Sequence, residues 1–362
     1  MQEVLFILLR LGLKNTVVSE EEYNCVKRLS VQQWKELITL SLRHGVAAIA
    51  VDGVQQLYEN YESLMKEPEL RNLKMKWYTH VIFLETRNRQ QITQMKQMGQ
   101  MWSYNECRML LMKGQANGLY FPNPLHRETG DVDCYLFENY DKGNQLATAV
   151  GAKINADWYK HSQIGFNGEI FENHQYFVHT REGKRSKRLN QTLCQLLQEE
   201  ELTCYPDSSI LLPPVMFNAL FLTYHGFAHF ISEGIRLKQV LDWAMFLKME
   251  QYNIVWDELY LLCEKFKLKR YLIAMNTIAV RYLGVKITNP DVLIESPYAE
   301  RIFRSVLYDD DYVFSSGEGS WRNRLHIITN LFKYRWKYHE IYQENVLKQL
   351  YYYVFGYFFH TE

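Results

Sequence analysis

Apolar residues recur at helical spacing along much of the chain. Between about residues 67 and 106 they stand three and four positions apart, a pattern that predicts one or two long helices. Upstream, Ser19 with Glu22 and Ser30 with Gln33 have the spacing of capping boxes, which mark the first turn of a helix. The first hundred residues are therefore predicted to be helical.

The pattern changes at Arg108. A short apolar run over residues 109–112 ends at Lys113-Gly114, and a loop with two prolines separates it from a second apolar segment at residues 131–137. This order predicts a strand, a turn, a short helix, a loop and a second strand. Farther along, Asn167-Gly168 is the strongest short-range signal for a two-residue hairpin turn.

Helical periodicity resumes at Asn190 and persists nearly to the end of the chain, after a basic run at residues 183–188 that we expect to form a surface loop. These patterns predict an α+β, helix-rich fold with a small mixed β-sheet core between N-terminal and C-terminal helical regions. We place the three parts at residues 1–104, 105–205 and 206–362.

Composition narrows the class of protein. The chain of 362 residues has 41 Lys and Arg and 41 Asp and Glu, so it lacks the basic excess of a nucleic-acid binder. Its six cysteines include no CxxC pair, which predicts free thiols in a reducing, cytoplasmic setting. No segment reaches the roughly 18 apolar residues of a membrane span. The aromatic tail at residues 350–360 is too short for one, and we expect it to pack back as a helix.

Two acidic residues in the second predicted strand suggest a cation site. Asp131 and Asp133 are two residues apart, so their carboxylates project from one face of the strand. Mg²⁺ binds one or two carboxylates together with substrate phosphates. Glu172 is the best third carboxylate for a two-metal clamp, and His174 shares its face. The alternative is a solvated strand end.

The Lys113-Gly114 turn is a candidate phosphate site. It follows a predicted strand and opens a predicted helix, so free backbone N–H groups, a flexible Gly and a cation meet where a triphosphate could bind. The alternative is a plain turn glycine beside a solvated lysine.

These motifs resemble a known family. The segment LLMKGQANGLYFPNPLHRETGDVDCYLF at residues 110–137 is similar to the KG, Arg and GDxD core of bacterial uncharacterised nucleotidyltransferases of the DNA polymerase beta-like superfamily. IFENHQ at residues 170–175 and LFLTYHGFAHFISEGIRLKQVLDWAMFL at residues 220–247 resemble a later strand and a helical segment of that family. The similarity extends over about residues 5–250.

The resemblance implies a nucleotidyltransferase fold with Asp131 and Asp133 as metal ligands and Glu172 as the third carboxylate. Lys113 and Gly114 would stand where the superfamily has a Gly-Ser turn. Two further residues of the core, Arg127 and Gly130, would bind the nucleotide, with Arg127 contacting phosphate or supporting the loop. This chain departs from the superfamily in lacking that Ser and in having Cys134-Tyr135 after the GDxD element.

Two histidines lie four residues apart on a predicted helix. His225 and His229 have a spacing that permits metal binding, but Gly226 replaces the Glu of a zinc-peptidase motif. They either pack between the helical region and the core or, with His174 and Arg236, line the nucleotide or acceptor site. Asp242-Trp243 is interpreted as a structural pair.

The sequence therefore predicts an enzyme that uses Mg²⁺ or Mn²⁺ to transfer a nucleoside monophosphate from a nucleoside triphosphate, with ATP as the first expectation, and releases pyrophosphate. The acceptor remains open among a small molecule, a sugar phosphate and a protein. The alternative is a non-catalytic nucleotide-binding or interaction module that keeps the fold.

Overall fold

The computed structural model describes residues 1–60, 68–180, 183–308, 329 and 332–348. The aromatic tail predicted to form a helix lies outside the described residues. The longer helices are α1 (Gln2–Gly12), α2 (Glu20–Lys27), α3 (Val31–Arg43), α4 (Ala47–Asn60), α5 (Pro68–Tyr104), α6 (Gly114–Gly118), α7 (Tyr140–Ala149), α8 (Lys184–Glu199), α9 (Val215–Ser232), α10 (Leu237–Glu250), α11 (Trp256–Lys265), α12 (Lys269–Arg281) and α13 (Ala299–Tyr308). The strands are β1 (Leu110–Met112), β2 (Val132–Tyr135), β3 (Lys153–Asn155), β4 (His161–Phe166) and β5 (Glu169–His174). Short helices of other types span Pro124–His126, Phe137–Asn139 and Lys337–Tyr342.

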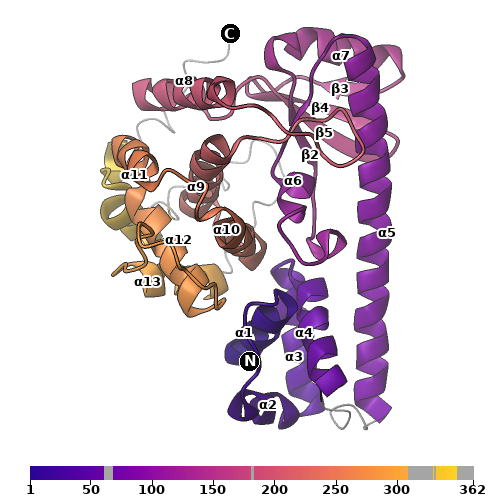
Figure 1. Ribbon diagram of the computed structural model, residues 1–362, viewed down its shortest axis with the longest axis vertical. Coiled ribbons are helices and arrows are strands. Elements are labelled where there is room, and N and C mark those ends of the chain that lie inside the picture. The colour runs from indigo at the N-terminus through magenta and orange to yellow at the C-terminus, as the bar shows by residue number, and fades with distance from the viewer. Residues whose placement is uncertain (61–67, 181–182, 309–328, 330–331, 349–362) are drawn as a thin grey trace.

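The N-terminal region is helical, as predicted. Both capping boxes form, with Ser19 accepting a hydrogen bond from the Glu22 amide and Ser30 accepting one from the Gln33 amide. The long apolar pattern is one helix of 37 residues, α5. In Figure 1 it runs along one side of the molecule, from the N-terminal helices at one end to the β-sheet at the other.

The sheet is small and mixed, which confirms the predicted α+β class. Its strand order is β1-β2-β5-β4-β3, in which β2 pairs with β5 in parallel and the other neighbours are antiparallel. The Asn167-Gly168 turn joins β4 to β5 as a hairpin, as predicted. The backbone of Leu211 also exchanges hydrogen bonds with Leu111 of β1 and with Met109, which directly precedes this strand. The chain beyond residue 205 therefore returns to the sheet.

One face of the sheet packs against α5 and α7. Val132, Cys134, Ile164 and Phe171 point to this side and belong to one hydrophobic core with Met and Trp residues of α5. Trp102 meets the ring of Phe171 edge-on, with ring centroids 6.2 Å apart. Because side chains alternate along a strand, Asp133 of β2 and Glu172 and His174 of β5 lie on the opposite face.

Aromatic packing joins that opposite face to α9. Tyr135 of β2 contacts Phe177, with ring centroids 4.5 Å apart, and Phe177 contacts Phe217 of α9 at 4.9 Å. Tyr135 follows the GDxD segment in sequence, and its ring is the first in this series of contacts. The C-terminal helices are thereby held against the polar side of the sheet.

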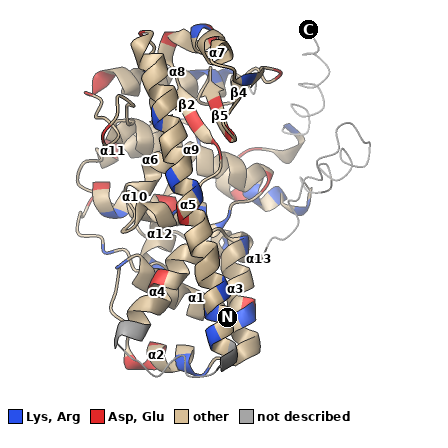
Figure 2. Ribbon diagram, turned by 90° about the vertical axis from the view of Figure 1, so that its right-hand side faces the viewer, with Lys and Arg blue, Asp and Glu red and all other residues tan. Residues whose placement is uncertain are grey.

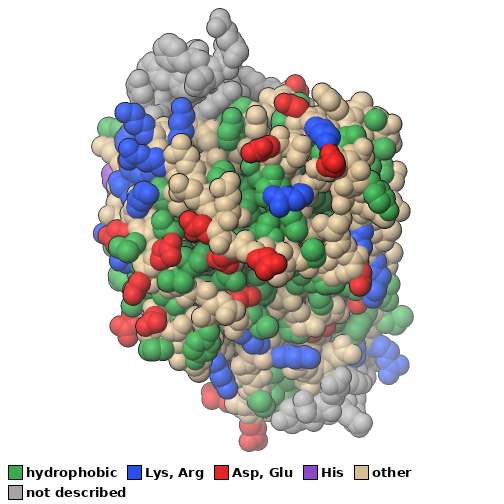
Figure 3. All heavy atoms as spheres, turned by 45° about the horizontal axis from the view of Figure 1, so that its top comes forward, with side chains coloured by type: hydrophobic (Ala, Val, Ile, Leu, Met, Phe, Trp, Pro, Cys, Tyr) green, Lys and Arg blue, Asp and Glu red, His purple; other side chains and the backbone are tan. Residues whose placement is uncertain are grey.

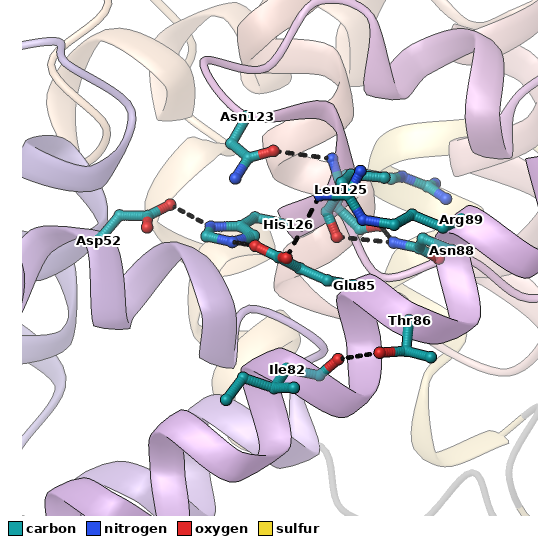
Figure 4. A network of polar contacts seen from close by, with 10 residues as sticks. Asp52, Ile82, Glu85, Thr86, Asn88, Arg89, Asn123, Leu125 and His126 are labelled. Carbon is teal, nitrogen blue, oxygen red and sulfur yellow. Dashed lines mark hydrogen bonds and ion pairs between the residues drawn. The ribbon is translucent and has the colours of Figure 1, made fainter.

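A buried histidine links the N-terminal helices to the loop before β2 (Figure 4). His126 lies between Asp52 of α4 and Glu85 of α5, with its ring nitrogens 2.7 and 2.9 Å from their carboxylate oxygens. Burial alone would lower the pKa of His126, but the two carboxylates raise it above its ordinary value. Protonated His126 therefore connects three segments of the chain.

The prediction of a loop at residues 183–188 was wrong. Gly183 is the N-cap of α8, and the basic residues form its first turns. Lys and Arg are good helix formers, and Lys184, Lys187 and Arg188 are exposed on this helix. Residues 183–188 contain no apolar side chain because they form a turn of helix that faces solvent.

The surface carries both charges, as the equal numbers of basic and acidic residues in the sequence lead us to expect. Figure 3 shows side chains of both charges and hydrophobic side chains intermixed on one face of the molecule. Within the described parts of the chain, no helix combines the length and the hydropathy that crossing a membrane requires.

Candidate active site

Three carboxylates meet on the face of the sheet opposite α5. Asp133 of β2 is paired in register with Glu172 of β5, and Asp131 immediately precedes β2. The strand begins at Val132, one residue later than predicted. Acidic residues on β2 and β5 are visible in Figure 2. Parallel pairing of the two strands therefore brings together residues that are about 40 positions apart in sequence.

Asp133 is the most strongly paired of the three carboxylates. Its Oδ1 atom is 2.7 Å from Nζ of Lys113 and 3.0 Å from Nε2 of His174. Burial would raise the pKa of Asp133, but the Lys113 ammonium and the His174 hydrogen bond outweigh burial and hold the pKa well below its usual range. Asp133 is therefore ionised at neutral pH.

Asp131 and Glu172 respond to their surroundings in opposite ways. Burial and the negative charges of Glu172 and then Asp133 raise the pKa of Asp131. Burial also acts to raise the pKa of Glu172, but hydrogen bonding to His174 and the nearby His161 lower it overall. The repulsion felt by Asp131 would be relieved by a cation placed among the three carboxylates.

The turn after β1 has an unusual backbone. Lys113 has φ 51° and ψ −146°, and Gly114 has φ +38°. A lysine in this region is strained, and such strain is concentrated at functional sites. From this turn the side chain of Lys113 reaches Asp133, with Nζ 2.7 Å from Oδ1. Helix α6, which follows, has only five residues.

Gly130 lies at the other end of the loop, directly before Asp131. A Cβ atom at Gly130 would meet nothing within 4 Å, so packing within the protein does not require a glycine at this position. The exposed backbone here leaves room for the close approach of a ligand.

His161 was not predicted from the sequence. It is paired in register with His174, and each is the sixth residue outward from the hairpin turn. Its Nε2 atom is 3.3 Å from a Glu172 oxygen. Counting outward from Asn167-Gly168 on both strands was the signal that could have found it, because a two-residue turn fixes the register of a hairpin.

Two further histidines come from α9. His225 stacks on Phe221, and its ring centroid is 4.3 Å from that of His229. Burial, and then the positive charge of Lys113, lower the pKa of His225 well below its ordinary value. His229 instead hydrogen-bonds Glu233 on the same helix. His225 thus lies beside the carboxylate site, and His229 lies one turn farther along the helix.

Arg236 and Arg127 differ in placement. Arg236 is exposed, at the position before α10, where its backbone N–H donates to Gln239. Arg127 is buried and donates two hydrogen bonds to Asp242, of 3.0 Å from Nε and 2.6 Å from Nη2. Of the two roles expected for Arg127, this geometry favours support of the loop. Asp242 is its partner on α10.

Buried amides of α5 fix the approach to Asp131. Gln91 donates from Nε2 to the backbone oxygen of Gly130 at 2.6 Å and accepts a hydrogen bond from Gln115. Asn88 donates to the backbone oxygen of Arg127 and accepts from Thr129. These partners lie 24 to 41 residues away in sequence, so local patterns gave no signal for them.

Comparisons with known protein families agree with the chemistry that the carboxylates of the site suggest. No curated protein and no solved structure matches the chain. A family described as uncharacterised nucleotidyltransferases matches residues 30–284, which include the Lys113-Gly114 turn, the three carboxylates and helices α9 and α10. Since the match covers more than half of the chain, this protein belongs to the family of uncharacterised nucleotidyltransferases.

Proposed function

We propose that this protein transfers a nucleoside monophosphate from a nucleoside triphosphate, ATP in the first instance, to an acceptor hydroxyl or phosphate and releases pyrophosphate. The observation that carries the proposal is the convergence of Asp131, Asp133 and Glu172 beside the strained Lys113 turn. Family membership supports a nucleotidyl transfer. The acceptor class stays open among small molecules, sugar phosphates and proteins.

The donor set fits a hard divalent cation. All three carboxylates are on one face of two paired strands, and burial together with the charges of Glu172 and Asp133 raises the pKa of Asp131. Mg²⁺ and Mn²⁺ prefer such oxygen ligands together with substrate phosphates. When bound, the ion would neutralise negative charge on the phosphates and hold them for in-line displacement.

The chain's own residues have separate tasks in this reaction. Asp131 and Asp133 hold the ion, and Lys113 exchanges its contact with Asp133 for one with the triphosphate. Glu172, which is ionised because its pKa is lowered, accepts the proton of the acceptor hydroxyl. The acceptor oxygen forms a bond to the α-phosphorus while the bond from this phosphorus to the leaving pyrophosphate oxygen breaks.

The test is calorimetric titration of each nucleoside triphosphate with Mg²⁺, followed by measurement of pyrophosphate in the same samples. Asp131→Asn is expected to lose both metal-dependent binding and pyrophosphate release. The matched control is Asp141→Asn, on the exposed surface of α7, which should keep both. Because burial and then repulsion by Glu172 and Asp133 raise the pKa of Asp131, Asp131→Asn should melt no lower than the wild type.

The outcomes separate the two candidate functions. Metal-dependent nucleotide binding that is lost in Asp131→Asn, with release of pyrophosphate, supports the transferase. The same binding without pyrophosphate under any acceptor screened supports the alternative, a nucleotide-binding module. Unfolding of Asp131→Asn would show that Asp131 has a structural role and would contradict the proposal.

A further inference from the structure

A second group of ligand atoms lies beside the three carboxylates. His161, Glu172 and His174 each offer one atom, and these atoms all lie within 4.8 Å of one another. Glu172 uses different oxygens toward the two rings, with Oε1 at 3.3 Å from Nε2 of His161 and Oε2 at 3.5 Å from Nε2 of His174. The carboxylate of Glu172 therefore lies between two imidazoles.

The orientation of His174 is set by its other nitrogen. Nδ1 is 3.3 Å from the backbone oxygen of Tyr176, and because a carbonyl oxygen only accepts, the proton lies on Nδ1. Nε2 then faces oxygens of Asp133 and Glu172, at 3.0 and 3.5 Å. A cation bound to Nε2 would contact these oxygens as well. A histidine that donates from one nitrogen to a backbone carbonyl is also the usual arrangement at metal sites.

The second imidazole, that of His161, is covered by an aromatic ring near the surface. His161 stacks on the exposed ring of Trp158, with an interplanar angle of 9°. The side chain of His174 is 1% exposed, whereas those of His161 and Glu172 are 15% and 16% exposed. The cluster is thus closed on the side of His174 and open on the other, which leaves a position for a substrate atom or water, as in catalytic metal sites with three protein ligands.

We propose that His161, Glu172 and His174 bind a divalent transition-metal ion of the Mn²⁺ or Zn²⁺ class, at a position distinct from the one formed by Asp131 and Asp133. Two nitrogen donors and one oxygen favour such an ion over Mg²⁺, which prefers oxygen ligands alone. Glu172 is shared between the two positions. This inference concerns the same site as the proposed function. It does not depend on nucleotide binding, because the ion would bind without nucleotide.

The experiment titrates Mn²⁺ into the protein in the presence of excess Mg²⁺ and without nucleotide. Electron paramagnetic resonance measures the affinity, and electron spin-echo modulation detects nitrogen bound to Mn²⁺. The wild type should show nitrogen modulation, and labelling its histidines with ¹⁵N should change the modulation. His161→Gln should reduce the nitrogen modulation, because only His174 is left to supply nitrogen. It should also weaken Mn²⁺ binding at least about tenfold, since even the outer partners of metal ligands contribute 10–100-fold.

Matched variants define the position of the ion. His179→Gln changes a histidine that lies near the cluster but hydrogen-bonds Tyr159, and it should leave the modulation unchanged. Asp131→Asn should keep the nitrogen modulation while losing nucleotide binding, so the two proposals fail separately. Absence of modulation in the wild type, or no effect of ¹⁵N-histidine, would overturn the inference. The labelling experiment needs no variant, so it holds even if a substitution prevents folding.

Discussion

Replacing Arg127 by Met is expected to destabilise the protein strongly. The guanidinium donates two hydrogen bonds to Asp242, and the two side chains are only 8% and 9% exposed. Charge-assisted hydrogen bonds contribute roughly 1.5–3 kcal/mol each, and breaking a buried pair by removing one partner costs about 3–5 kcal/mol because the other charge is left uncompensated. Asp242→Leu should have a cost of the same size.

The double variant Arg127→Met/Asp242→Leu should be more stable than either single variant, because it buries no unpaired charge. Urea unfolding measures this difference. For a denaturant slope of about 3 kcal/mol per molar, a loss of about 4 kcal/mol lowers the midpoint by roughly 1.3 M. The same variants, titrated with a nucleoside triphosphate and Mg²⁺, report whether Arg127 also contacts phosphate.

Two results would refute this reasoning. Single variants that unfold within about 0.3 M urea of the wild type would show that the pair contributes little to stability. A double variant that is as unstable as the sum of the two single variants would show that the residues act independently. If the double variant is stable but no longer binds nucleotide, Arg127 has the phosphate role in addition to the structural one.

Four further predictions concern the helical packing and the supports of the site. His126→Gln should lower the melting temperature most below about pH 6.5, and the difference should vanish as pH rises through the raised pKa of folded His126, which melting curves across pH would check. Gln91→Leu should cost about 1–3 kcal/mol in urea unfolding, because it removes the buried acceptor of Gln115 as well as the hydrogen bond to the Gly130 oxygen. Gly53→Ala should unfold at much lower temperature, since its Cβ would lie 2.0 Å from the backbone oxygen of Leu8. In contrast, Gly130→Ala should melt like the wild type and lose affinity only where a ligand approaches its backbone.

The elements that could be predicted from the sequence are those with local causes. The Ser19 and Ser30 capping boxes act over three residues, and the Asn167-Gly168 turn acts over two, so each can be recognised in isolation. The basic run at residues 183–188 was misassigned because a solvated helical turn and a solvated loop have the same composition. Propensity is a weak guide there, since no apolar position marks the face of the helix.

The parts of the site that could not be predicted depend on distant contacts. The partner of Arg127 is 115 residues away, and the approach to Asp131 is fixed by buried amides of α5 that look like ordinary polar positions of a long helix. The alternation of side chains along a strand was enough to predict that Asp131 and Asp133 share one face, and that Glu172 and His174 share one face. It could not show that the two strands are neighbours, because β3 and β4 intervene in sequence.

The charge balance of the site suggests why metal and nucleotide would bind together. Lys113 already forms an ion pair with Asp133, and His174 lies 3.0 Å from the same oxygen, so an ion bound to this oxygen would displace a contact of the protein with itself. A triphosphate offers Lys113 another anionic partner and so frees Asp133 for the ion, while the ion lowers the repulsion between the phosphates and Asp131. Each ligand thereby removes a cost that the other would meet alone, which is positive coupling between the two binding events.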